Sequence, residues 1–268
     1  MKIPRTNIDP NLEIAHIIDE IKNYFIENGD KNTKAIIGIS GGKDSTIAAA
    51  LLVRALGKNR VIGVMMPESV QTDIDDSRKV CEILGIQSFE IDIGPACHAL
   101  YKDFQDDTFG ELMVNPQIRT NTPARIRMTT LYMVAAAVGG RVINTGNASE
   151  LYVGYTTKYG DLAGDFAIFK NYYVRDVLAI GDALEELPIY LVNKAPGDGM
   201  SGKTDEDNMG FTYEQLDAYL IDCITPEYEI LRNIEERHTR NVHKNAVHIP
   251  SIRTVSRQWI HVDGAFEF

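Results

Sequence analysis

The residues best suited to chemistry stand in the stretch SGGKDS, residues 40–45, which follows an apolar run. Adjacent glycines such as Gly41 and Gly42 let backbone N–H groups approach a phosphate closely, and the N-terminus of a following helix favours negative charge. Asp44 would repel a phosphate, so its place here makes sense if a Mg²⁺ ion stands between the two. The alternative is a tight strand-to-helix turn in which Ser40 is an ordinary helix cap. The whole combination favours a site for an anion and a metal.

Strands and helices alternate along the first half of the chain, and this alternation decides where such a site can lie. Apolar, β-branched runs predict buried strands at residues 34–40, 60–67, 86–94 and 141–146. Periodic apolar residues predict helices at residues 11–27, 44–56, 72–85, 95–107 and 118–138. The expected fold is α/β, a doubly wound, Rossmann-like open parallel sheet with helices on both faces. Ligands of such sheets bind beyond the carboxyl ends of the strands, where residues 40–45 lie.

The residue composition of the chain changes after Glu150. Two stretches rich in Gly, Asp, Asn and Lys, residues 154–170 and 193–211, predict long loops of the kind that serve as lids or binding loops. Further helices are expected at about 173–186, 212–222 and 226–239. We expect one domain over residues 1–268, with its core sheet at about 30–150 and its substrate loops, lid loops and C-terminal helices at about 151–268.

Composition narrows the class of ligand. The chain has 268 residues, of which 44% are hydrophobic, and a net charge of −11. An acidic chain is a poor partner for duplex nucleic acid, so local basic groups are expected to serve a small anionic ligand. Three distant cysteines suggest neither a disulfide framework nor a zinc site. No signal-like start and no apolar run of about 20 residues is present, and a cytoplasmic location is expected with no membrane partner.

A second glycine-rich stretch matches the Walker A spacing. GDGMSGKT runs from Gly197 to Thr204, but the match requires a preceding strand and a following apolar helix. The residues before it are NKAP, and those after it, DEDNMG, carry three acids that would repel a phosphate. We therefore interpret this stretch as a chance match.

The loop SGGKDS resembles the pyrophosphate-binding loop of the N-type ATP pyrophosphatases, whose fold is called adenine nucleotide alpha hydrolase-like. Further motifs occur in the order seen in ammonia-dependent NAD synthetases, and together they cover nearly the whole chain. They are ARIRM (124–128), TGNASE (145–150), GYTTKYGD (154–161), SGKTDEDNMGFTYEQLDAYL (201–220) and HK (243–244).

The resemblance implies a ligase that amidates nicotinic acid adenine dinucleotide (deamido-NAD) to NAD. ATP would first adenylate the carboxylate and release pyrophosphate, and ammonia would then displace AMP. Mg²⁺ is the implied cofactor and ATP the co-substrate. No glutaminase domain is recognised in these 268 residues, which favours free ammonia as the nitrogen donor. A homodimer is also implied, through the region RIRMTTLYMVAAAVGG (125–140), whose apolar side chains exceed what one face of a sheet needs.

The resemblance also assigns residues. Asp44 and Glu150 would bind Mg²⁺, and Asp44, Lys158 and Asp165 would be catalytic. The ATP-binding positions are Gly38, Ile39, Ser40, Gly41, Gly42, Lys43, Asp44, Ser45 and Thr145. The deamido-NAD positions are Arg125, Lys158, Asp165, His243 and Lys244.

Each of these residues has a plainer alternative. Glu150 could be a first-turn acid favoured by the helix dipole, and Thr145 a routine hydroxyl at a strand end. Lys43 could be an exposed lysine in the first turn of a helix, and Arg127 a helix-surface charge. The sequence Asn147-Ala148-Ser149 also fits a glycosylation acceptor, which in a cytoplasmic chain would be chance.

The sequence departs from the family on the ATP side. A lysine that contacts ATP falls at Val174, and a Thr or Ser expected in the late loop falls at Gly197. A familiar Asn-Pro or Leu-Pro reads Ala167-Ile168. An alignment shifted by one residue would make Arg175 the replacement cation, and Lys43 could compensate in part.

Two other functions compete with NAD synthesis. One is a paralogue that adenylates and amidates another carboxylate. The other is a non-catalytic nucleotide sensor on the same sheet, against which the pair Asp44 and Glu150 argues, because a sensor needs no metal bridge to pyrophosphate.

Overall fold

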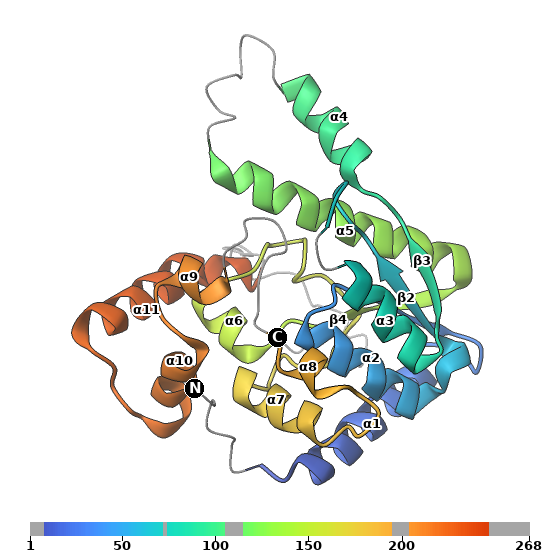
Figure 1. Ribbon diagram of the computed structural model, residues 1–268, viewed down its shortest axis with the longest axis horizontal. Helices are drawn as coiled ribbons and strands as arrows, with labels where there is room; N and C mark the ends of the chain where they lie inside the picture. Colours follow the sequence, from blue (N-terminus) through green and yellow to red (C-terminus); the bar gives the residue numbers. More distant parts are fainter. Residues whose placement is uncertain (1–7, 72–73, 105–114, 195–203, 247–268) are drawn as a thin grey trace, which may run out of the picture.

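A five-stranded parallel sheet forms the centre of the structure, a computed structural model that describes residues 8–71, 74–104, 115–194 and 204–246. The strands pair in the order β3-β2-β1-β4-β5, which confirms the predicted doubly wound sheet (Figure 1). Their bounds are β1 (Lys34–Gly38), β2 (Val61–Met65), β3 (Gln87–Glu90), β4 (Gly140–Asn144) and β5 (Phe166–Ala167). Because β2 lies on one side of β1 and β4 on the other, the chain reverses direction across the sheet between β1 and β4. The loops that follow these two strands therefore diverge and leave a crevice for ligands.

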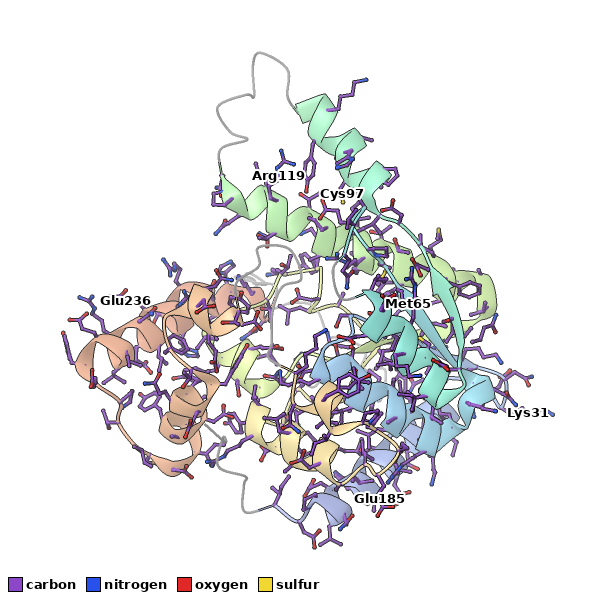
Figure 2. All side chains as sticks on the ribbon, in the orientation of Figure 1. Lys31, Met65, Cys97, Arg119, Glu185 and Glu236 are labelled. Carbon is purple, nitrogen blue, oxygen red and sulfur yellow. The ribbon has the colours of Figure 1, made fainter. Side chains whose placement is uncertain are left out.

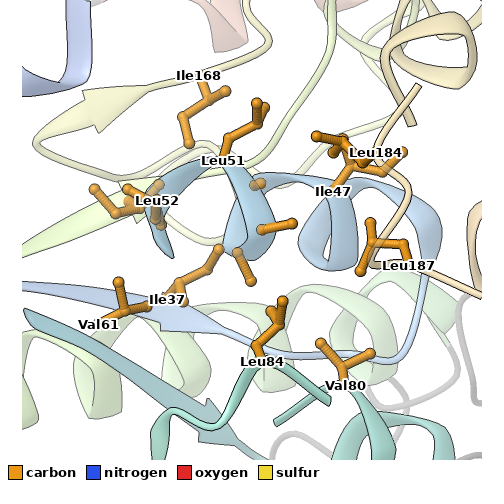
Figure 3. Close-up of a cluster of buried hydrophobic side chains, with 14 of the residues drawn as sticks. Ile37, Ile47, Leu51, Leu52, Val61, Val80, Leu84, Ile168, Leu184 and Leu187 are labelled. Carbon is orange, nitrogen blue, oxygen red and sulfur yellow. The ribbon is translucent and has the colours of Figure 1, made fainter. Parts of the chain in front are cut away.

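Helices cover both faces of the sheet. One face carries α1 (Pro10–Glu27), α2 (Lys43–Leu56), α3 (Ile74–Leu84), α7 (Val174–Asp182) and α8 (Ile189–Val192), and the other carries α4 (Gly94–Phe104) and α5 (Pro116–Val138). Figure 3 shows the larger core, a buried cluster that includes Ile37 and Val61 of the sheet and Leu51 of α2. Side chains of alternate register, such as Ile36 and Val142, pack toward α5. Both faces are thus buried, which explains why these strands are apolar without alternation.

The C-terminal helices form a third packed unit beside the sheet. It contains α6 (Ala148–Val153), α9 (Asp205–Met209), α10 (Tyr213–Asp222) and α11 (Tyr228–Asn241), and short 3₁₀ turns occur at Lys58–Arg60 and Val242–Lys244. Figure 1 shows α6, α9, α10 and α11 grouped at one end of the molecule. Their apolar cluster includes Val153, Val174, Tyr213 and Ile234.

Most predicted elements are confirmed within a few residues, and one short strand and three short α-helices were not predicted. Strand β5 has two residues, α8 has four, and α6 and α9 have six and five. Residues 105–107 of the predicted helix 95–107 and Thr72 at the start of the predicted helix 72–85 lie outside the described residues. Within the described residues, no helix combines the length and the apolar character needed to cross a membrane.

A buried polar network joins α6, α7 and α10. Ser149 Oγ donates to Asp217 Oδ1 at 2.5 Å and accepts from the backbone N–H of Val174 at 3.1 Å. The second oxygen of Asp217 accepts from the backbone N–H of Arg175 at 2.9 Å. Burial raises the pKa of Asp217 to about 6. These bonds fix the direction of α6, which carries Glu150.

We expect the Asp217 carboxyl to make stability depend on pH. The pKa of this carboxyl is 3.8 in the unfolded chain and about 6 in the folded one. Between these two pH values the unfolded chain has lost a proton that the folded chain keeps. The free energy of unfolding should therefore fall as pH rises from 4 to 7, by up to about 3 kcal/mol from this group. Urea denaturation of wild type and Asp217→Asn measures it, because the variant lacks this titration. Parallel curves against pH for the two proteins would contradict the assignment.

Candidate active site

A cavity of about 1700 Å³ opens beyond the carboxyl ends of β1 and β4. Its walls come from the loop after β1, from α5, from the segment after β4 and from the C-terminal end of α11. Ligand pockets for drug-sized molecules are usually about 300–1,000 Å³. This cavity is therefore large enough for more than one nucleotide.

The glycine loop is shaped to receive an anion. Gly41 has φ of +76°, and a Cβ atom there would lie 3.1 Å from the backbone nitrogen of Ser77, so only glycine fits without strain. Gly42 is the N-cap of α2 and has no side chain that could cap the first turn. The first N–H groups of α2 are thus left for a ligand. Ser45 Oγ donates to the Gly42 carbonyl oxygen at 3.1 Å and lies 3.1 Å from Ser40 Oγ, which keeps the loop closed.

The two predicted metal ligands are joined by one asparagine. Asp44 and Glu150 both line the cavity. Asn147, fully buried, donates from Nδ2 to Asp44 Oδ1 at 3.2 Å and from its backbone N–H to Glu150 Oε2 at 3.1 Å. Its Oδ1 accepts from the backbone N–H of Glu150 at 3.0 Å, which completes a capping box on α6. Burial and the charge of Asp44 raise the pKa of Glu150.

This pair of carboxylates fits a hard divalent cation. Mg²⁺ commonly takes one or two protein carboxylates and completes its shell with phosphate oxygens and water. In the described part of the chain, no group of three or more His, Cys, Asp or Glu side chains is placed to hold a metal. Asp44 and Glu150 could therefore hold Mg²⁺ together with a phosphate ligand, and Thr145 lies on the same wall.

A second group of cavity residues, called the basic end below, is rich in cations, and four of the five predicted dinucleotide residues meet there. Arg125 Nε donates to the Lys158 carbonyl oxygen at 3.2 Å, and Lys158 Nζ donates to the His243 carbonyl oxygen at 2.7 Å. Lys244 Nζ donates to the carbonyl oxygen of Gly154 at 2.7 Å. Helix α5, the loop after α6 and the end of α11 are thus tied together at one place.

Further cations extend this end along α5. Arg127 was open to interpretation as a surface charge, but it is half-buried, lines the cavity and donates from Nε to the Met66 carbonyl oxygen at 3.0 Å. Burial lowers the pKa of Arg127. Figure 2 shows Arg119 where α5 passes α4, and its guanidinium lies 4.4 Å from the ring centroid of Tyr101.

Asp165 does not lie with the other predicted residues. It is outside the cavity wall, and its carboxylate accepts from the backbone N–H of Val142 at 2.7 Å and from the Tyr132 hydroxyl at 3.1 Å. The acid of this loop that does line the cavity is Asp161, which accepts from the Thr157 N–H at 2.6 Å. Burial raises the pKa of Asp161.

The structure also shows where some of the residues lie at which the sequence departs from the family pattern. Val174 is buried in the core of the C-terminal unit and does not line the cavity. Arg175 does not line it either, because its guanidinium forms two hydrogen bonds with Asp222, at 2.6 and 2.9 Å. Arg175 is thus no replacement cation. Gly197 and the Walker-like stretch lie outside the described residues, apart from Thr204, which caps α9.

Sequence reasoning missed several cavity residues. Asn147 was noted within the motif TGNASE and as a glycosylation acceptor but was given no role in the site, although its spacing to Glu150 is that of a capping box. Lys194, Arg237 and Arg240 also line the cavity, and no local spacing marked them. Lys194 Nζ lies 2.5 Å from Asp76 Oδ2.

Comparison with known proteins shows to which family the chain belongs. Residues 13–249 match the family model described as NAD synthase. The chain belongs to the NAD synthase family. The NH(3)-dependent NAD(+) synthetase of Pyrococcus furiosus is 32% identical over 246 residues, which span 88% of this chain and 92% of that protein.

Solved structures of the same family share the fold. An NMN synthetase from Francisella tularensis matches with a TM-score of 0.83 and 31% identity, over 91% of this chain and 99% of that one. An NH3-dependent NAD synthetase from Campylobacter jejuni matches with a TM-score of 0.69 and 27% identity over the same shares. The predicted adenine nucleotide alpha hydrolase-like fold is confirmed.

Asn147 gives a test of how the NAD synthase site is built. Asn147→Ala removes the side-chain bond to the Asp44 carboxylate and the side-chain cap of α6, and keeps the backbone N–H bond to the Glu150 carboxylate. We expect the free energy of unfolding to fall by about 1 kcal/mol and ATP turnover to fall by about 100-fold, because small misplacements of reacting groups are costly. Steady-state kinetics and urea denaturation measure the two effects.

Thr212→Ala is the matched control. It removes an equivalent capping box from α10, outside the cavity, and should lower stability without changing turnover. Asp44→Asn, which removes a proposed metal ligand, gives the low turnover with which the two other variants are compared. Equal turnover in the Asn147 and Thr212 variants would show that Asn147 only caps a helix.

Proposed function

We propose that this protein is an ammonia-dependent NAD synthetase, which amidates deamido-NAD to NAD with ATP and Mg²⁺ and releases AMP and pyrophosphate. The observation that carries the proposal is that one cavity is lined by two chemically distinct groups of residues, here called its two ends. One end has the glycine loop with Asp44 and Glu150, and the other has Arg125, Lys158 and Lys244. ATP with its metal suits the first end, and a dinucleotide with two phosphates suits the second. The names of the ammonia-dependent relatives support the nitrogen donor.

The reaction needs activation because a carboxylate is a poor acyl electrophile. In the proposed path a carboxylate oxygen of the substrate attacks the α-phosphorus of ATP and pyrophosphate leaves. Ammonia then attacks the acyl carbon, the bond to AMP breaks, and the nitrogen loses a proton to give the amide. Mg²⁺, held by Asp44 and Glu150, would supply positive charge for the leaving pyrophosphate.

The residues of this chain position the two substrates. The first N–H groups of α2 face the phosphate chain and favour negative charge at the leaving group. Arg125 and Lys158 would hold the dinucleotide with His243 and Lys244, so that the carboxylate meets the α-phosphorus between the two ends. Such positioning can supply about 7–11 kcal/mol of a barrier. Lys158 is the proposed catalytic cation of this group.

A second candidate substrate is nicotinic acid mononucleotide. The match to the NMN synthetase from Francisella tularensis has the higher TM-score, 0.83 against 0.69, at equal shares of both chains. Amidation of the mononucleotide would use the same metal end of the cavity and only part of the basic end.

Product analysis with both carboxylates tests these proposals. The protein is incubated with ATP, Mg²⁺, ammonium and either deamido-NAD or nicotinic acid mononucleotide. We expect AMP and pyrophosphate, formed only with both a carboxylate and Mg²⁺, and a higher kcat/KM for deamido-NAD. The reverse preference would favour the second candidate. Formation of ADP and phosphate would contradict adenylation, and no turnover with either carboxylate would contradict the function.

We also propose that the protein is one domain that pairs as a homodimer through α5. The family match from 13 to 249 spans both halves of the chain, which supports one domain. On α5, Val134 and Ala135 are buried against the sheet, whereas Met133 and Val138 are 57% and 37% exposed. A second copy over this face would also cover Asp165, beside Tyr132, and could bring it to a shared substrate site.

Sedimentation equilibrium tests the pairing. A dimer at micromolar concentration is expected, because apolar side chains on α5 lose contact with water on association. Met133→Asp should shift the protein toward a monomer. A wild-type protein that sediments as a monomer would contradict the pairing.

A further inference from the structure

Lys43 is a buried cation at the metal end of the cavity. Its side chain is 3% exposed, and its Nζ lies 2.8 Å from Asp44 Oδ2. The ammonium also lies 5.6 Å from the ring centroid of Tyr213, which is itself 1% exposed. The sequence left open an exposed lysine in a first helical turn, and this alternative is wrong. Burying an ammonium costs several kcal/mol unless opposite charges compensate.

The compensation comes from the carboxylates of the site. Burial alone would lower the pKa of Lys43, but the charges of Asp44, Glu150 and Asp205 outweigh it and raise that pKa. Lys43 is therefore charged at neutral pH. Asp44 and Glu150, which are half-buried and would otherwise repel each other, have this cation next to them.

The proposed metal needs the same two carboxylates. A Mg²⁺ ion bound by Asp44 and Glu150 would take over the role that Lys43 has in the structure, and the ammonium would then face a second cation. Lysine suits a change of partner, because it has three donors on a flexible stem. The nearest new acceptors would be the phosphate oxygens of ATP, since Lys43 lines the same cavity wall as the glycine loop.

We propose that Lys43 is a stand-in cation, which balances Asp44 and Glu150 before the metal binds and passes to the phosphates of ATP when it does. This rests on the proposed function, in which the pair holds Mg²⁺ and the loop holds ATP. Lys43 thus lowers the affinity of the free site for a divalent cation and raises its affinity for ATP.

The two effects have opposite signs, which separates the proposal from a merely structural ion pair. Lys43→Met keeps an unbranched side chain and removes the charge. We expect the ATP-free variant to bind Mn²⁺ about tenfold more tightly than wild type, because one nearby positive charge is gone. With Mn²⁺ present it should bind a non-hydrolysable ATP analogue at least about tenfold more weakly, since a charge-assisted hydrogen bond is lost. Electron paramagnetic resonance of free Mn²⁺ and isothermal titration calorimetry measure the two affinities.

Matched variants control the experiment. Lys194→Met removes another lysine of the cavity, which pairs with Asp76 and not with Asp44, and should leave the Mn²⁺ affinity within about twofold of wild type. Lys43→Arg keeps the charge and should not tighten Mn²⁺ binding. Lys43→Gln, a polar neutral variant, replaces Lys43→Met if the latter does not fold.

The two affinity measurements can each overturn one part of the proposal. Unchanged or weaker Mn²⁺ binding in the neutral Lys43 variants overturns the stand-in role. Tighter Mn²⁺ binding with unchanged binding of the ATP analogue overturns the transfer to phosphate. Neither result depends on turnover, so a failure of the proposed function would appear separately, as a wild-type protein that forms no AMP and pyrophosphate.

Discussion

The site places several carboxylates close together and must still bind the negatively charged phosphates of nucleotides. The cavity wall has the carboxylates of Asp44, Glu150, Asp161 and Asp205, in a chain whose net charge is −11. Nucleotide phosphates would be repelled unless positive charge lay between them and these groups. The structure supplies it from backbone N–H groups at the start of α2, from Lys43, and from the arginines and lysines at the other end. The proposed metal completes the balance.

The order of the strands makes this balance possible. Because β1 and β4 are neighbours, the first turn of α2 with Asp44 and the first turn of α6 with Glu150 lie side by side, although the two residues are 106 positions apart in the sequence. Asn147 then joins the two carboxylates, and the bonds from Asp217 to Ser149 and Arg175 fix the helix that carries Glu150. Removing any of these contacts would leave the ligands present but misplaced, which is costly in a reaction that depends on position.

The sequence could predict the sheet and its loop because their signals are local. Buried strands, the glycines of residues 40–45 and the capped helices each follow from a short stretch. The order of the family motifs predicted one dinucleotide site, and the structure brings four of its residues together: Arg125, Lys158, His243 and Lys244. Asp165 belonged to the same set, yet a hydrogen bond to the Val142 N–H holds it outside the cavity.

Other features depend on contacts between distant segments, which spacing does not reveal. The burial of Lys43 requires Tyr213 of α10 and the carboxylate of Glu150, both far away in the chain. Strand β5 has only two residues and forms because β4 offers a free edge. Arg175 looked like a cation for ATP, but Asp222 takes both of its terminal nitrogens.

The most direct test of the central claim follows the oxygen atoms. If the two ends of the cavity bring a carboxylate to the α-phosphorus of ATP, one carboxylate oxygen must leave with AMP when ammonia attacks. Deamido-NAD labelled with ¹⁸O in its carboxylate, turned over with ATP, Mg²⁺ and ammonium, should give AMP that contains one ¹⁸O atom, as read by mass spectrometry. Unlabelled AMP formed alongside the amide would contradict the account.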